Sequence, residues 1–177
     1  MIRLATENDI SYIISLSKKE SPAIGFIPSP AYKAAITGQK FGKRWSLTCN
    51  DKLFVCEENK DLVGFVLFSY GAIAKCNQIC IQEDARMFER GKSLLNAAIK
   101  QGESVGIIDF SCGCADDLPS NLFWELMGWT KVGERKGISH KNTWKESSGR
   151  KVNIYRYQSF SLFTGNTGYI KAICTNE

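Results

Sequence analysis

The chain has 177 residues, of which 44% are hydrophobic and 23% are charged, and its formal net charge is +5. This composition is that of one ordinary soluble domain, long enough to bury most of its apolar surface without disulfide bridges. No stretch approaches 18 uncharged apolar residues, and the N-terminal residues lack the features of a signal peptide, so we expect a cytoplasmic protein.

The first part of the chain predicts one strand followed by two helices. Residues 2–6 have the pattern of a short strand, and Thr6 with Asp9 three positions later has the pattern of a helix N-terminal cap. Apolar residues then recur at helical spacing between positions 10 and 16. A second, shorter helix is expected to begin at Ser29, with Pro30 in its first turn, and to end at Gly38.

The rest of the chain predicts a β-rich stretch and then alternating helices and strands. Three antiparallel strands are expected at 52–58, 62–71 and 75–81. A helix from Gly91 to Gln101 follows, and residues 105–112 are a largely apolar run typical of a strand buried on both faces. A helix at 119–128 and two closing strands, at 130–135 and 152–158, complete an α/β pattern.

The cysteines predict free thiols, because there are seven of them at irregular spacings, mostly inside strand-like runs. A zinc site can be imagined from Cys76, Cys80, Cys112 and Cys114, but only the first two have a spacing found in structural zinc sites, and they lie on a predicted strand. We therefore expect no metal. His140 is the only histidine, and no nucleophile motif accompanies it.

Residues 131–151 form a basic segment with seven Lys or Arg residues and two Glu residues. The surplus of positive charge in this segment, 7 − 2 = 5, equals the formal net charge of the whole chain. Two interpretations stay open: a solvated loop, or a patch that attracts an acidic partner or a nucleic acid. We favour the solvated loop because Trp144 is its only aromatic residue and the chain has no nucleic-acid-binding motif.

The order of these elements resembles the GNAT superfamily of acetyl-CoA-dependent N-acetyltransferases. The resemblance rests mainly on "ICIQEDARMFERGKSLL" at 79–95 and "DLPSNLFWELMGW" at 117–129, and it covers most of the chain except residues 158–177. It implies a single GNAT-like domain in residues 1–177, with a mixed, largely antiparallel sheet flanked by helices on both faces. It also implies acetyl-CoA as cosubstrate and an amine as acetyl acceptor.

The family's cofactor turn, Q/R-x-x-G-x-G/A, is similar to residues 86–91. Arg86 fits the first position and Gly91 the last, whereas Glu89 replaces the middle glycine. Backbone N–H groups at a helix N-terminus favour an anion, and glycine lets a phosphate approach them. The alternative is an ordinary strand-to-helix connection. We expect a weakened pyrophosphate site in which Glu89 points away from the phosphates or is held by Arg86 or Arg90.

The resemblance also implies how the rest of the cofactor is held. The strand at 79–81 would pair with the pantetheine arm, the next strand would splay away from it, and the acyl group would lie between the two. The residues implied at the cofactor are Ile79, Cys80, Ile81, Arg86, Met87, Phe88, Glu89, Arg90, Gly91, Lys92, Asp117, Asn121 and Trp124.

The implied catalytic positions depart from the family pattern. Many members carry a basic Glu where this chain has Gln78, and a Tyr acid where it has Trp124, whose indole N–H only donates a hydrogen bond. We expect Trp124 to pack beside the acyl position. Glu83 is the third catalytic candidate, and Glu57, Glu58, Asp117 or water are alternative bases.

Several functions therefore stay open. The first is an acetyltransferase that depends mainly on positioning, and the second is a GNAT-fold binding or interaction module without chemistry. A nucleic-acid binder that uses residues 131–151 is the weakest alternative. For the enzyme we expect a small-molecule or peptide amine as acceptor and no membrane or nucleic acid as partner, and a homodimer is compatible with the sequence.

Overall fold

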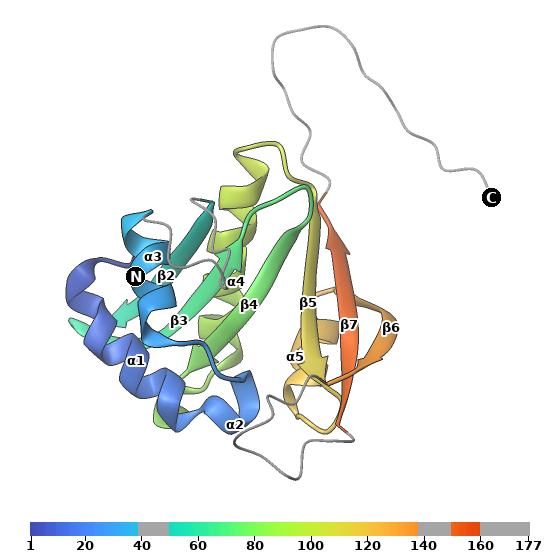
Figure 1. The fold of residues 1–177 in the computed structure, drawn as a ribbon, viewed down its shortest axis with the longest axis horizontal. Helices are drawn as coiled ribbons and strands as arrows, with labels where there is room; N and C mark the ends of the chain where they lie inside the picture. Colours follow the sequence, from blue (N-terminus) through green and yellow to red (C-terminus); the bar gives the residue numbers. More distant parts are fainter. Residues whose placement is uncertain (39–49, 138–149, 160–177) are drawn as a thin grey trace, which may run out of the picture.

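The computed structural model describes residues 1–38, 50–137 and 150–159. In these residues a seven-stranded sheet has the order β1-β2-β3-β4-β5-β7-β6 (Figure 1). Every neighbouring pair is antiparallel except β4 and β5, which are parallel. The elements are β1 (Ile2–Leu4), the 3₁₀ turn η1 (Glu7–Asp9), α1 (Ile10–Lys19), α2 (Ser21–Ile24), α3 (Ser29–Thr37), β2 (Asp51–Glu58), β3 (Asp61–Ser69), β4 (Ala74–Ile81), the 3₁₀ turn η2 (Glu83–Ala85), α4 (Phe88–Glu103), β5 (Asp109–Ala115), α5 (Ser120–Leu126), β6 (Thr130–Lys136) and β7 (Lys151–Gln158).

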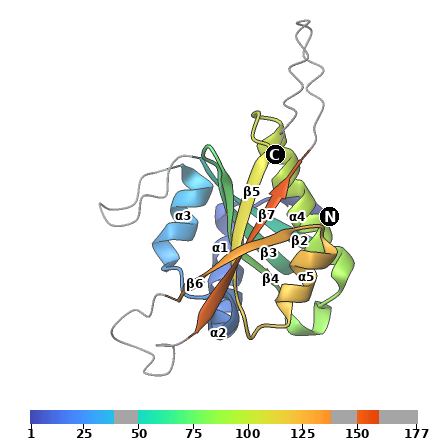
Figure 2. The same cartoon turned by 90° about the vertical axis from the view of Figure 1, so that its right-hand side faces the viewer.

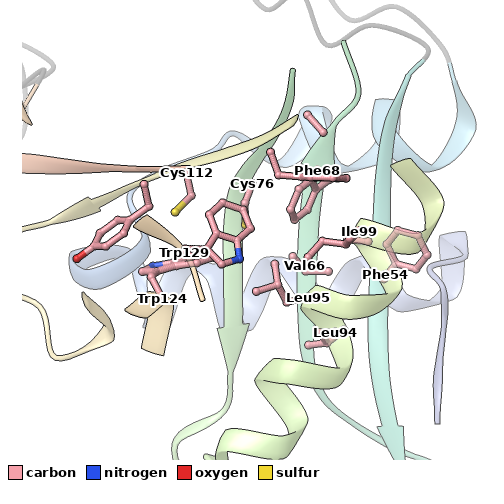
Figure 3. Close-up of a cluster of buried hydrophobic side chains, with 14 of the residues drawn as sticks. Phe54, Val66, Phe68, Cys76, Leu94, Leu95, Ile99, Cys112, Trp124 and Trp129 are labelled. Atoms are coloured by element: carbon pink, nitrogen blue, oxygen red, sulfur yellow. The ribbon is translucent and has the colours of Figure 1, made fainter. Parts of the chain in front are cut away.

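Helices cover both faces of the sheet, as the sequence predicts (Figure 2). Successive side chains of a strand point to opposite faces, so Phe65 joins the core under α1 and α3, whereas Val66 joins the core under α4. The α4 core extends from Leu94 and Leu95 to Trp124 of α5 (Figure 3). The predicted mixed α/β architecture is confirmed.

The first helical segment begins where the Thr6–Asp9 pattern predicts. The Asp9 carboxylate accepts hydrogen bonds from the backbone N–H of Thr6 at 2.7 Å and from its hydroxyl at 3.0 Å. Arg3 of β1 donates two more, at 2.7 and 3.0 Å. These bonds, chiefly those from Arg3, lower the pKa of Asp9 to about 2. The sheet edge and the start of the helix are thus joined by one buried carboxylate.

The structure differs from the predicted elements at three places. α2 is an additional turn of helix that the sequence pattern does not indicate. α4 begins at Phe88, three residues before Gly91, because Met87 is the extended residue that precedes the helix. The strand expected at 105–112 begins only at Asp109, after a turn at Gly106 with φ of 82°. Its side chains alternate between buried and accessible, so the prediction of a strand buried on both faces is wrong.

The cysteines of the described residues are free and buried, as expected. No group of three potential metal ligands occurs in the part of the chain that the structure describes. Within the same residues, no helix is both long and apolar enough to cross a membrane. His140 and Trp144, which belong to the central part of the basic segment, lie outside the described residues.

Candidate functional site

β4 and β5 separate after three paired residues and leave a cleft between them. Their pairing ends at Cys76 and Cys112, and the strands then diverge toward their C-terminal ends (Figure 1). The cleft encloses about 550 Å³ and is lined by β4 residues from Cys76 to Ile81 and β5 residues from Cys112 to Ala115. The splay that the sequence resemblance implies is therefore observed.

A β-bulge in β4 sets which side chains face the cleft. Cys76 and Gln78 pair with consecutive residues of β3, so Asn77 is the extra residue of the bulge. A bulge reorients the strand that contains it. Before the bulge, Cys76 belongs to the core under α4, whereas after it Cys80 belongs to the core under α1 and α3. Asn77 and Gln78 both line the cleft.

Gln78 is held at both ends of its amide. Its Oε1 accepts a hydrogen bond from the hydroxyl of Tyr32 at 2.6 Å. Its Nε2 donates to the backbone carbonyls of Gly25 at 2.9 Å and Ile24 at 3.3 Å. The Tyr32 hydroxyl also lies 2.6 Å from the hydroxyl of Ser17. Gln78 therefore holds the end of α2 against β4, and its amide cannot take a proton as a general base would.

The cleft is lined from both faces of the sheet. On the face of α4, its lining comes from the turn at 86–91 and from α5. On the opposite face it comes from Glu20, Ala23 and Ile24 at the end of α1 and in α2. A ligand in this cleft can thus be approached by a second molecule from the other side of the sheet.

The N-terminus of α4 opens into the cleft. Its first N–H groups have no partner within the helix, and the helix dipole places positive charge there. Gly91 faces α5 so closely that a Cβ atom in its place would lie 3.0 Å from the Phe123 ring. The packing of α4 against α5 therefore favours a glycine here, in addition to any approach of a phosphate.

Glu20 is a cleft residue that no sequence motif marks. Its carboxylate lies 2.6 Å from Nη2 of Arg86, and its side chain is only 12% exposed. Among the described residues that line the cleft, Glu20 is the one with a carboxylate and Arg86 is the one with a positively charged side chain. The two are 66 positions apart in the chain, so only the packing of α1 and α2 against β4 brings them together.

Solved structures of acetyltransferases share this fold. An N-acetyltransferase from Staphylococcus aureus is 15% identical, with 89% of this chain and 97% of that chain covered and a TM-score of 0.70. The ribosomal-protein-S18-alanine N-acetyltransferase of Escherichia coli is 13% identical, with 96% and 99% covered and a TM-score of 0.68. A Bacillus subtilis acetyltransferase in complex with CoA is 11% identical, with 89% and 97% covered and a TM-score of 0.65.

The chain has the GNAT fold. Comparisons with protein-family models and with curated protein sequences find no match. The likeness to GNAT proteins is thus carried by the three-dimensional arrangement, at sequence identities that show the fold alone.

The GNAT-type turn at 86–91 is only partly in the cleft. Four of its residues line the cleft, namely Arg86, Met87, Phe88 and Gly91. The three β4 residues expected at the pantetheine arm also line the cleft, namely Ile79, Cys80 and Ile81.

The other charged residues of this turn lie outside the cleft lining. Glu89 is exposed, and its carboxylate lies 3.5 Å from Nζ of Lys92, its neighbour one helical turn along α4. Arg90 pairs with Glu58 and donates to the Ala85 carbonyl at 2.5 Å. Of the two arrangements expected for Glu89, the structure has the one in which the side chain points away from the cleft, because Arg86 and Arg90 pair with other carboxylates.

Asn121, expected at the cofactor, instead shapes the turn that precedes α5. Its Nδ2 donates to the carbonyls of Ala115 and Leu118, both at 2.7 Å. Its Oδ1 accepts from Asn153 at 2.9 Å and from Tyr155 at 3.0 Å. Asn121 does not line the cleft, since its polar atoms are directed into this network.

Asp117, the other residue expected near the cofactor, also lies outside the cleft lining. Its carboxylate accepts a hydrogen bond from Arg150 at 2.8 Å, which lowers the pKa of Asp117. Arg150 also donates to the Pro22 carbonyl of α2 at 3.0 Å. This contact ties the β5–α5 connection to α2 across the open end of the cleft.

Two of the three catalytic candidates line the cleft. They are Gln78 and Trp124. Trp124 is buried, with its ring 5.4 Å from the Phe123 ring and 4.9 Å from the Trp129 ring, measured between centroids. Glu83 lies on the exposed turn η2, and its carboxylate is 3.9 Å from Nζ of Lys19. Glu83 is thus outside the cleft, because η2 carries it past the end of β4.

Four thiols line the cleft, and burial keeps them protonated at neutral pH. Burial raises the pKa of Cys80 to about 12 and raises those of Cys76 and Cys112 further. Burial also raises the pKa of Cys114, although hydrogen bonds from Ser120 and Trp124 oppose this rise.

Proposed function

We propose that this protein is an acetyl-CoA-dependent N-acetyltransferase that acetylates an amine. The observation that carries the proposal is the cleft between β4 and β5. It is lined from both faces of the sheet, and the N-terminus of α4 opens into it. It therefore offers one side to a cofactor and the other to an acceptor.

The residues present fit acetyl-CoA. Beyond Cys76, the β4 edge that faces β5 pairs with no strand in the described residues, so its backbone groups are available to an extended amide arm. The N-terminus of α4 and Arg86 supply positive charge for the pyrophosphate. The splayed strands leave space for the acetyl group near the bulge at Asn77.

In the proposed reaction the nitrogen of a neutral amine attacks the thioester carbon. A C–N bond forms, the C–S bond breaks, the thiolate of coenzyme A leaves, and water takes the proton from the nitrogen. Gln78 and Trp124 move no proton in this step. Holding the two reactants in line supplies most of the acceleration, because general acid–base catalysis typically contributes only about a hundred- to ten-thousand-fold.

The test combines binding with turnover. Titration calorimetry with free coenzyme A and acetyl-CoA is expected to show binding below millimolar concentration. Release of free thiol from acetyl-CoA is then followed with small polyamines, amino acids and peptides that have free N-termini. Absence of coenzyme A binding at millimolar concentration overturns the proposal.

A GNAT-fold binding module is the second candidate. The engagement of both ends of the Gln78 amide favours it, because the position of the family's base is used to hold α2. Tight binding of coenzyme A without transfer to any acceptor class would select this candidate.

A further inference from the structure

Glu20 and Arg86 form an ion pair that spans the cleft from one face of the sheet to the other. Glu20 lies at the junction of α1 and α2, and Arg86 lies at the end of η2, just before α4. Their side chains are 2.6 Å apart and are 12% and 53% exposed, respectively. Arg86 also donates to the Ile81 carbonyl at the end of β4, at 3.4 Å.

The pair conflicts with a phosphate at the turn. Under the proposed function, Arg86 binds the pyrophosphate, which offers it more negative charge than one carboxylate. A phosphate beside Arg86 would also lie near Glu20, and the two like charges would repel. The ligand is therefore expected to draw Arg86 away from Glu20.

Glu20 would then lack a cation. No other Lys, Arg or His lines the cleft within the described residues. A largely buried carboxylate without a partner is unfavourable, so the loaded cleft favours a ligand that restores a positive charge beside Glu20. Glu20 lies on the α1 and α2 face, opposite the turn, which is the side left for an acceptor.

We propose that Glu20 binds a cationic group of the acceptor, in the place that Arg86 leaves when coenzyme A binds. This inference rests on the proposed function and names its substrate class: amines that carry a positive charge, in preference to neutral or acidic ones. Arg86 and the acceptor compete for one carboxylate. Coenzyme A and the acceptor therefore bind with positive coupling.

The experiment uses two probes and a matched pair of variants. Glu20→Gln removes the carboxylate from the cleft. Glu83→Gln makes the same change in the exposed pair with Lys19, outside the cleft. Calorimetry at low ionic strength measures coenzyme A for each protein. It then measures 1,4-diaminobutane and the neutral 1,4-butanediol, each with and without saturating coenzyme A.

Glu20→Gln is expected to bind coenzyme A about three- to tenfold more tightly than the wild type and Glu83→Gln, because Arg86 is already released. Saturating coenzyme A should strengthen diamine binding in the wild type and in Glu83→Gln but not in Glu20→Gln. The diol should show no such coupling. Arg86→Gln provides an independent test. This variant should bind coenzyme A more weakly, and in the absence of coenzyme A it should bind the diamine more tightly.

Weaker or unchanged coenzyme A binding by Glu20→Gln would show that Glu20 only steadies Arg86, and it overturns the inference. Diamine coupling that persists in Glu20→Gln overturns it as well. Either result leaves the proposed function standing if the wild type binds coenzyme A. Failure of the wild type to bind coenzyme A defeats the proposed function itself.

Discussion

The hydroxyl of Tyr32 donates a hydrogen bond to Oε1 of Gln78 across 2.6 Å, and this contact joins α3 to the β4 bulge. On its other side the Gln78 amide donates to the end of α2. Gln78 thus holds β4, which borders the cleft, to the end of α2, which lines it.

Gln78→Glu is expected to lower the free energy of unfolding by about 1–3 kcal/mol at pH 7. A carboxylate cannot donate to the carbonyls of Ile24 and Gly25, and its charge would be buried. Gln82→Glu is the matched control, because Gln82 accepts a hydrogen bond from Tyr12 that a carboxylate can keep. Urea denaturation measures both variants. Equal unfolding free energies of Gln78→Glu and Gln82→Glu would contradict the role of Gln78 in holding α2 against β4.

Asp9→Asn is expected to destabilise the protein by about 1–3 kcal/mol at pH 7, since Asp9 accepts charge-assisted hydrogen bonds from Arg3. The pKa of Asp9 is lowered from 3.8 to about 2 in the folded protein. Its contribution is therefore present above pH 4 and is lost as the pH falls toward 2.

Urea denaturation of the wild type and Asp9→Asn at several pH values should show the difference shrinking between about pH 5 and pH 2. Glu7→Gln removes an exposed acid from the same turn and is expected to change the unfolding free energy by less than about 0.5 kcal/mol. A difference that stays constant over this pH range would argue against the Arg3–Asp9 interaction.

Gly91→Ala is expected to weaken coenzyme A binding while leaving the protein folded. Alanine favours the helix by about 1 kcal/mol over glycine, but its methyl group would press on the Phe123 ring, which lines the cleft. Gly133→Ala is the control, because a Cβ atom at Gly133 has no neighbour within 4 Å. Calorimetry with coenzyme A and thermal unfolding distinguish the two effects, and wild-type affinity in Gly91→Ala would refute the role of this packing.

Glu89→Gln is expected to strengthen coenzyme A binding by less than about threefold, and the gain should vanish at raised salt concentration. The side chain of Glu89 is 69% exposed and pairs with Lys92, so water screens its repulsion of a phosphate. Glu103→Gln at the other end of α4 serves as the control. A tenfold gain would place Glu89 inside the anion site.

Trp124→Tyr is expected to lower the free energy of unfolding by about 1–3 kcal/mol, because it leaves space in the cluster with Phe123 and Trp129. Turnover of acetyl-CoA is expected to rise, since a phenol with an ordinary pKa of about 10 can protonate the leaving thiolate. Trp129→Tyr loses a similar volume outside the cleft and should show only the destabilisation. Unchanged turnover of Trp124→Tyr from about pH 6 to 9 would contradict the acid role at this position.

The sequence by itself determined the order of the elements, apart from the short helix α2, because local patterns encode most of them. Thr6 and Asp9 mark the first cap, and Gly38 and Gly128, with φ of 71° and 78°, end two helices where predicted. Apolar runs separated by polar turns indicated the strands of the sheet, and the resemblance to GNAT proteins indicated that β4 and β5 splay apart. These features depend on neighbours within a few positions or on a known order of elements.

Only the tertiary structure decided which polar side chains face the cleft. The bulge at Asn77 turns Gln78 toward Tyr32, and the packing of α1 and α2 brings Glu20 to Arg86. The sequence around Asn121 and around Glu83 does not indicate that their side chains lie outside the cleft. Hydrogen bonds and ion pairs between distant positions depend on the register and separation of packed elements, and a residue's type and spacing along the chain do not specify these distances.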